Sequence, residues 1–130
     1  METAPGNWTV MAAGSDIWGW NDQFHFVQFN RTEDVTVTCF VESFATQYEW
    51  GKGGLMIRDT LDPNSAHAMS VQTGHDYGRL AMQTRPSSRS NSGGMSKWLN
   101  TGTKRVWLRI VKEGNAVKSY YKKEGELVYQ

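Results

Sequence analysis

The clearest pattern along the chain is an alternation of apolar and polar residues between positions 34 and 44. In the stretch DVTVTCFVESF, one side carries Val35, Val37, Cys39 and Val41. The other side carries Thr36, Thr38, Phe40 and Glu42. A period of two is typical of a strand with one buried face. We therefore predict a strand here, with the Cys39 thiol facing the core.

Most of the remaining chain also divides into segments of strand length. Residues 23–30, QFHFVQFN, are aromatic and β-branched, and the polar stretch NRTED would join them to 34–44 as a hairpin. Further strands are predicted at 54–59, 66–73, 78–85, 104–114 and 115–125. Turn residues separate them at 62–64 and 113–115, and 86–96 is a Ser/Gly-rich loop. Strands repeated at this spacing, with no amphipathic helical window, predict an all-β sandwich or barrel.

Length and charge narrow the class of protein. A chain of 130 residues fits one domain, 1–130. The formal net charge of +1 favours neither nucleic acid nor a membrane surface as partner. No apolar run approaches the roughly 18 residues of a transmembrane helix, and the N-terminus lacks the pattern of a signal peptide. Two N-x-[S/T] sequons, at Asn7 and Asn30, give a faint hint of secretion.

Metal and redox chemistry find little support in the sequence. The single cysteine, Cys39, cannot form an internal disulfide or a zinc cluster. The three histidines have no ligand-like spacing. The oxygen-rich stretch 58–65 is better explained as a turn than as a calcium loop. We expect no metal and no cofactor.

Catalytic motifs are absent as well. The acidic residues Asp16, Asp22, Glu42 and Glu49 form no recognisable pair of the kind that glycoside hydrolysis needs. Nucleophile elbows, phosphate loops and dinucleotide fingerprints are not found. The sequence therefore argues against an enzyme. A glycoside hydrolase-like enzyme is the outside alternative, which two close carboxylates on a concave face would revive.

Aromatic residues in or beside the predicted loops point to binding. These rings are Trp18, Trp20, Trp50, Tyr77 and Trp98. Exposed rings on loops can stack on sugars or anchor a protein partner. We expect Trp18 to plug one end of the sandwich. The predicted ligand-binding residues are Trp20, Asn21, Trp50 and Tyr77.

Two blocks of sequence resemble a known family. GSDIWGWNDQFHFV from Gly14 and WGKGGLMIRDTLDPNSAHAM from Trp50 are similar to DUF1349-type, concanavalin A-like domains, a distant branch of which includes the yeast regulation of enolase protein. Weaker similarity follows at Arg85, 107–109 and 114–115. These domains occur mostly in bacterial secreted and cell-surface proteins.

The resemblance implies a two-sheet antiparallel jelly-roll sandwich that binds carbohydrate or mediates adhesion outside the cell, without catalysis. It supplies no set of ligand residues. Where the family has D-G-x-x-W near its end, this chain has EGELVYQ, and family members extend further at both ends. A fold trimmed at its termini would leave an open sheet edge. Self-assembly into oligomers or filaments through that edge is therefore the alternative function.

The same blocks suggest a structural role for four charged residues. Charges within strands beside aromatic rings must be paired or face water. We hypothesise that Asp16 or Asp22 pairs with Lys52 or Arg58 across neighbouring strands, with Trp18 packed over the pair.

Overall fold

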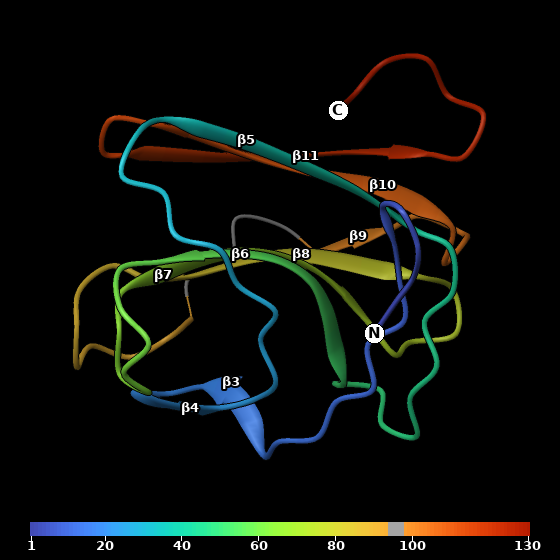
Figure 1. Ribbon diagram of the computed structural model, residues 1–130. Helices are drawn as coiled ribbons and strands as arrows, with labels where there is room; N and C mark the ends of the chain where they lie inside the picture. The colour runs from blue at the N-terminus through green and yellow to red at the C-terminus, as the bar shows by residue number, and fades with distance from the viewer. Residues whose placement is uncertain (94–97) are drawn as a thin grey trace.

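The protein is built from antiparallel β-sheets. The computed structural model describes residues 1–93 and 98–130, with only the backbone of Trp98, and no helix occurs in them. The two larger sheets lie one above the other (Figure 1). The predicted all-β class is confirmed.

One layer is a three-stranded sheet in the order β11-β10-β5. Its strands are β5 (Val35–Val41), β10 (Val106–Glu113) and β11 (Ala116–Lys123). Their inward residues meet the other layer, where Val106 and Leu108 pack with Leu80. Cys39 pairs with Leu108 and packs against this cluster, which confirms that it faces the core.

The other layer is a four-stranded sheet in the order β6-β7-β8-β9. Its strands are β6 (Lys52–Arg58), β7 (His67–Thr73), β8 (Arg79–Arg85) and β9 (Trp98–Asn100). Every residue of β7 is buried, because the strand has neighbours on both sides and layers on both faces. Strands β5, β6, β7, β8, β10 and β11 all match predicted segments to within a few residues.

Two small hairpins complete the fold. They are β1 (Glu2–Ala4) with β2 (Asn7–Trp8), and β3 (Asp16–Trp18) with β4 (Asn21–Gln23). The β3–β4 hairpin covers the face of the four-stranded sheet that is turned away from the three-stranded sheet (Figure 1). Ile17 of β3 packs there against Met69, Val71 and Ala81, which forms a second core cluster.

The predicted strand 23–30 is wrong beyond its first residue. Strand β4 ends at Gln23, and residues 24–30 form no strand. After β4 the chain leaves the four-stranded sheet and crosses to the start of β5 in the other layer (Figure 1). Since the segment spans two layers, it cannot pair along β5, and the hairpin predicted through NRTED does not form.

The predicted loop 86–96 is interrupted by two bridge residues. Ser92 and Gly93 form isolated bridges with Gly19 and Thr84. The remainder, 94–97, lies outside the described residues. The short strands β1, β2, β3 and β9, and all of β4 except Gln23, were missed, because two or three residues carry no periodic signal.

Candidate functional site

The β3–β4 hairpin is positioned by a pair of residues that point at the sheet beneath it. Ile17 and Asp22 are opposite one another in the hairpin, so their side chains lie on the same face. Both are buried. Ile17 enters the second core cluster, and Asp22 is placed over the end of the sheet. The hairpin turns at Gly19, whose φ of 64° is readily available to glycine.

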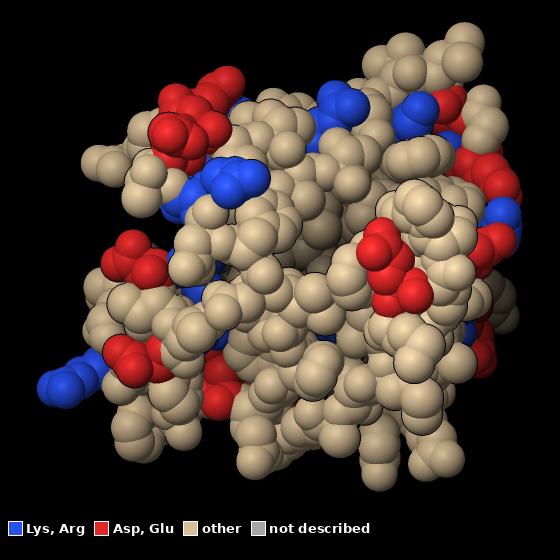
Figure 2. Space-filling model, viewed as in Figure 1, with Lys and Arg blue, Asp and Glu red and all other residues tan. Residues whose placement is uncertain are grey.

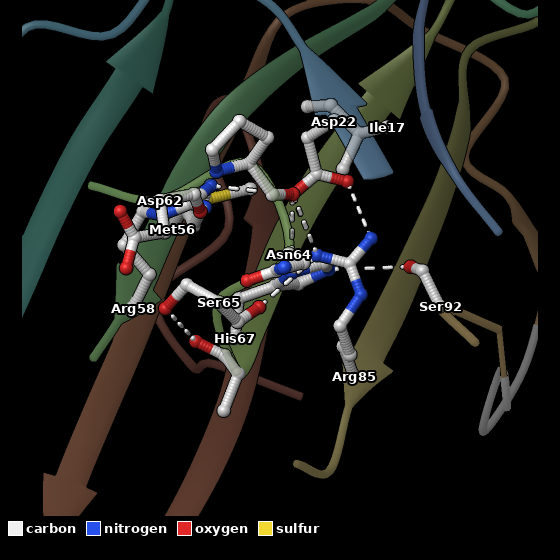
Figure 3. A network of polar contacts seen from close by, with 12 residues as sticks. Ile17, Asp22, Met56, Arg58, Asp62, Asn64, Ser65, His67, Arg85 and Ser92 are labelled. Atoms are coloured by element: carbon white, nitrogen blue, oxygen red, sulfur yellow. Dashed lines mark hydrogen bonds and ion pairs between the residues drawn. The ribbon is translucent and has the colours of Figure 1, made fainter. Parts of the chain in front are cut away.

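Three strands supply a row of nitrogen-bearing side chains beneath Asp22. Arg58 of β6 is opposite His67 of β7, and His67 is opposite Arg85 of β8. Directly paired residues share a face, so all three side chains point toward the hairpin. Figure 3 shows this convergence around the Asp22 carboxylate.

The Asp22 carboxylate binds both guanidinium groups. Arg85 donates from Nη1 to Oδ2 at 2.8 Å and from Nη2 to Oδ1 at 2.6 Å, which is a bidentate pair. Arg58 donates from Nη1 to Oδ2 at 3.3 Å. Asp22 and Arg85 have 0% exposed side chains, and Arg58 has 4%. We call Asp22, Arg58, His67 and Arg85 the ion cluster.

Backbone carbonyls add further partners for the two arginines, although the buried Nε of Arg85 has no hydrogen-bond partner among the described residues. Arg85 donates to the carbonyl oxygens of Gly19 at 3.0 Å, Pro63 at 3.2 Å and Ser65 at 3.0 Å. Arg58 donates to the carbonyls of Thr60 and Asp62. The ion cluster therefore joins the hairpin turn and the β6–β7 connection to the sheet.

A second ion pair joins the hairpin to the other end of β6. Lys52 Nζ lies 2.5 Å from Asp16 Oδ1, with the Asp16 side chain 50% exposed. The prediction that Asp16 or Asp22 pairs with Lys52 or Arg58 is confirmed, and the structure shows two such pairs, Asp16 with Lys52 and Asp22 with Arg58. Trp18 does not plug the sandwich, since it is 51% exposed. Because Ile17 faces the sheet, its neighbour Trp18 faces away from it.

Ser92, His67 and Asp22 have the composition of a catalytic triad. Ser92 Oγ lies 3.2 Å from His67 Nε2, and His67 Nδ1 lies 3.6 Å from Asp22 Oδ2. In a working triad the aspartate accepts the Nδ1 proton, which leaves Nε2 free to take a proton from the serine.

The surroundings of His67 Nδ1 differ from those in a working triad. Arg85 Nη1 lies 3.4 Å from Nδ1 and Asp22 Oδ2 lies 3.6 Å from it, so a guanidinium that is itself bound to Asp22 stands beside the nitrogen that the aspartate would hold. Burial lowers the pKa of His67, which favours the neutral ring. Ser92, His67 and Asp22 are also all buried. The three residues form a buried polar network.

The predicted ligand residues lie at two ends of the four-stranded sheet. Trp20 and Asn21 are exposed in the hairpin turn, beside the ion cluster, because the neighbouring Gly19 carbonyl binds Arg85. Trp50 and Tyr77 are exposed beyond the opposite ends of the strands, next to Lys52 and Arg79. About six strand residues, or roughly 20 Å, separate the two ends. The four residues do not form one surface.

At the second end, exposed rings cluster on two adjoining loops. Tyr48 and Trp50 come from the β5–β6 connection, and Tyr77 comes from the β7–β8 turn. We call these three residues the aromatic end. The Trp50 ring meets the His75 ring edge-on, with centroids 4.9 Å apart. Tyr48 was not among the predicted ligand residues, although it stands two positions before Trp50 in the same loop.

Backbone contacts hold these two loops together. Gly74 N donates to the Gly51 carbonyl at 3.1 Å, and Gly51 N donates to the Tyr48 carbonyl at 3.0 Å. A Cβ atom at Gly74 would lie 2.1 Å from the Tyr48 carbonyl oxygen, so only glycine permits this approach. His75 is fixed in turn by Thr73 and Arg79, each at 3.0 Å. The two loops that carry the aromatic end are therefore held together by backbone hydrogen bonds and by the contacts of His75.

A hollow of about 260 Å³ lies beside the ion cluster. It is lined by Asp22, Gln23, Phe24, Phe26, Arg58, Leu61 and Pro63. The Arg58 guanidinium lies over the Phe24 ring, 5.2 Å from its centroid. The carboxylate and the guanidinium that face the hollow already bind one another. The hollow therefore offers a ligand little polar recognition.

The fold and these sites define an all-β chain with a buried ion cluster at one end of a sheet and exposed rings at the other. No protein-family model, curated protein or solved structure matches the chain. Within the described ranges, no group of three or more His, Cys, Asp or Glu residues could hold a metal ion. The same ranges contain no helix that is long and apolar enough to span a membrane. The function is therefore inferred from the chain itself.

Proposed function

We propose that this chain is a non-catalytic carbohydrate-binding module, secreted or displayed at the cell surface, with the jelly-roll fold of concanavalin A-like domains. The observation that carries the proposal is the aromatic end, where Tyr48, Trp50 and Tyr77 are exposed on two hydrogen-bonded loops. Exposed large rings in one place mark an interaction surface rather than a packing requirement. The resemblance to DUF1349-type domains agrees with a sugar as the ligand.

Polar groups for sugar hydroxyls lie among these rings. Glu49 is exposed between Tyr48 and Trp50, with Oε2 3.8 Å from His75 Nε2. Asp76 is exposed beside Tyr77. A binding site typically combines such apolar faces with a few polar groups that orient the ligand.

The ion cluster supports the non-catalytic role in this proposal. Its carboxylate binds two guanidinium groups, and Asp22, His67 and Arg85 are buried away from a substrate. Asp16, the other carboxylate of the hairpin, binds Lys52. The two hairpin carboxylates are thus committed to structure.

A glycan-array screen followed by calorimetry on the best neutral oligosaccharide tests the proposal. Trp50→Ala should weaken binding about five-fold or more, the scale of losing an aromatic anchor. Trp20→Ala is the matched control, because Trp20 is 63% exposed and Trp50 52%, but Trp20 lies at the other end of the sheet. Thermal melts must show that both variants fold.

Two results would overturn this assignment. If Trp20→Ala loses binding and Trp50→Ala does not, the hairpin turn is the site. If the native protein binds no glycan, the module does not recognise carbohydrate.

Self-assembly is the second candidate, and strand β5 favours it. This edge strand, VTVTCFV, contains no charge and no proline. Among the described residues, no backbone hydrogen bond joins its free edge to another segment. Uncharged edge strands tend to pair with other chains. Light scattering across a concentration series should show dimers or larger species that the edge substitution Thr38→Lys abolishes; a monomer at every concentration would exclude this function.

A further inference from the structure

The outer face of the three-stranded sheet carries a second groove, far from the rings of the aromatic end. The groove has a volume of about 350 Å³ and is lined by Thr36, Arg109, Val111, Glu113, Tyr120 and Tyr129. The chain after β11 arches over this face (Figure 1), which brings Tyr129 above the strands. The groove therefore has a sheet as its floor and the C-terminal segment as one wall.

Arg109 is held at the centre of this face. It is opposite Thr38 of β5 and Tyr120 of β11, so it projects between them. Its Nε donates to Thr38 Oγ1 at 3.1 Å, and the Tyr129 ring lies over its guanidinium at 3.9 Å. Stacking uses the face of the guanidinium and leaves the edge of its two terminal nitrogens for a ligand. Within the described residues, these two nitrogens have no hydrogen-bond partner.

Two of the basic side chains on this face lack an acidic partner within the described ranges. Glu113 pairs with Lys118 at 2.8 Å, and Arg105 lies 2.7 Å from Glu124 and 3.9 Å from Glu42. Arg109 and Lys122 have no acidic partner in the described part of the chain, and both lie under the Tyr129 ring. Figure 2 shows basic and acidic side chains interspersed over the visible surface. This face complements a ligand with a few separate anionic groups.

We propose that this groove binds an acidic carbohydrate whose carboxylates are recognised by Arg109. A fixed guanidinium edge matches a carboxylate through two parallel hydrogen bonds. The hydroxyl of Thr36 and the rings of Tyr120 and Tyr129 supply the hydrogen bonds and flat faces that a sugar ring requires. Single-stranded nucleic acid is the weaker fit, because its binding uses an extended basic groove along many phosphates, whereas two cations are uncompensated here.

Calorimetry with a short oligogalacturonate tests this proposal on the intact chain. The fully methyl-esterified form of the same oligomer is the matched ligand, since it keeps the sugar rings and lacks the charges. The acid should bind, and its affinity should fall as salt is raised, while the ester should bind at least ten-fold more weakly. Oligothymidylate serves as the nucleic-acid probe.

Variants assign the binding to Arg109. Arg109→Gln should weaken acid binding at least ten-fold, and Arg109→Lys should lose most of that affinity, because lysine keeps the charge without the planar fork. Arg105→Gln is the matched control, because Arg105 is an exposed cation directly before β10 that is already paired with Glu124, and neither residue lines the groove. Trp50→Ala should leave acid binding unchanged, which separates this groove from the aromatic end.

Several results would overturn the proposal. These are no binding of the acid, equal binding of acid and ester, tighter binding of oligothymidylate, or full affinity in a folded Arg109→Gln variant. Loss of acid binding in Trp50→Ala alone would place the ligand at the aromatic end instead. The outcome of this experiment is independent of whether the aromatic end binds neutral glycans.

Discussion

The replacement of Asp22 by asparagine should be among the most damaging single changes in the hairpin. The substitution keeps the size of the side chain and removes its charge. The guanidinium groups of Arg58 and Arg85, with 4% and 0% exposed side chains, then remain buried with only carbonyl partners. Removing one partner of a buried ion pair typically costs about 3 to 5 kcal/mol, because the remaining charge is uncompensated.

That cost is large beside the total stability of a domain, which is typically about 5 to 15 kcal/mol. For a chain of this length it corresponds to a fall in Tm of roughly 10 to 20 °C. Urea unfolding followed by tryptophan fluorescence measures the difference directly. Equal slopes for wild type and variant would show that both unfold from a native state of similar compactness.

Asp16→Asn is the internal control for this measurement. It makes the same chemical change in the same hairpin, and it also breaks a pair with a cation of β6. The Asp16 side chain is 50% exposed, whereas that of Lys52 is 6% exposed, so the loss of this half-buried pair should cost about 1 to 3 kcal/mol, less than the loss of Asp22. If Asp22→Asn costs no more than Asp16→Asn, the ion cluster does not anchor the hairpin and the reasoning fails.

Three further outcomes are expected. Burial raises the pKa of the Cys39 thiol to about 11, so native labelling at pH 8 should be slow and should accelerate only in denaturant; rapid native labelling would contradict its inward orientation. Trp18→Ala should cost roughly 1 to 2 kcal/mol in urea unfolding, about half the value for a fully buried ring, and a loss above 3 kcal/mol would contradict its exposure. Burial lowers the pKa of His67, so the unfolded chain takes up the proton first and stability should fall as the pH drops below about 6.5; His67→Gln should reduce this slope, and an unchanged slope would exclude His67 as its source.

The sequence predicted the strands best where apolar and polar residues alternate over seven or more positions. Strand β5 shows this most clearly, because a period of two records directly which face is buried. The same local pattern failed at 24–30, where β-forming residues cross between layers instead of pairing. Propensity describes what a segment can form, whereas the available partner decides what it does form.

The charge pairs were partly predictable and the ion cluster was not. The sequence suggested that Asp16 or Asp22 pairs with Lys52 or Arg58, without deciding which carboxylate meets which cation. Arg85, which makes the stronger bonds, is 63 residues from Asp22 and comes from the strand beyond β7. Only the register of β6, β7 and β8 places Arg58, His67 and Arg85 side by side. No local spacing encodes that register, and no pattern in the sequence assigned a role to Arg85.

The exposure of the aromatic rings could be predicted from the sequence, but their arrangement in space could not. Trp20, Trp50 and Tyr77 were correctly expected to be exposed, since polar and turn residues surround them. Whether they share a surface depends on which end of the sheet each loop occupies, and the direction of the strands decides that.

The separation of the two ends has a consequence for how function can be tested. Sites more than about 10 Å apart with no shared partners perturb a protein independently. The ion cluster and Trp50 are roughly 20 Å apart along the strands. Damage to the ion cluster therefore lowers the stability of the fold without altering the loops that carry the aromatic end. Binding and stability become separable quantities in this molecule, because one sheet holds its structural charges at one end and its exposed rings at the other.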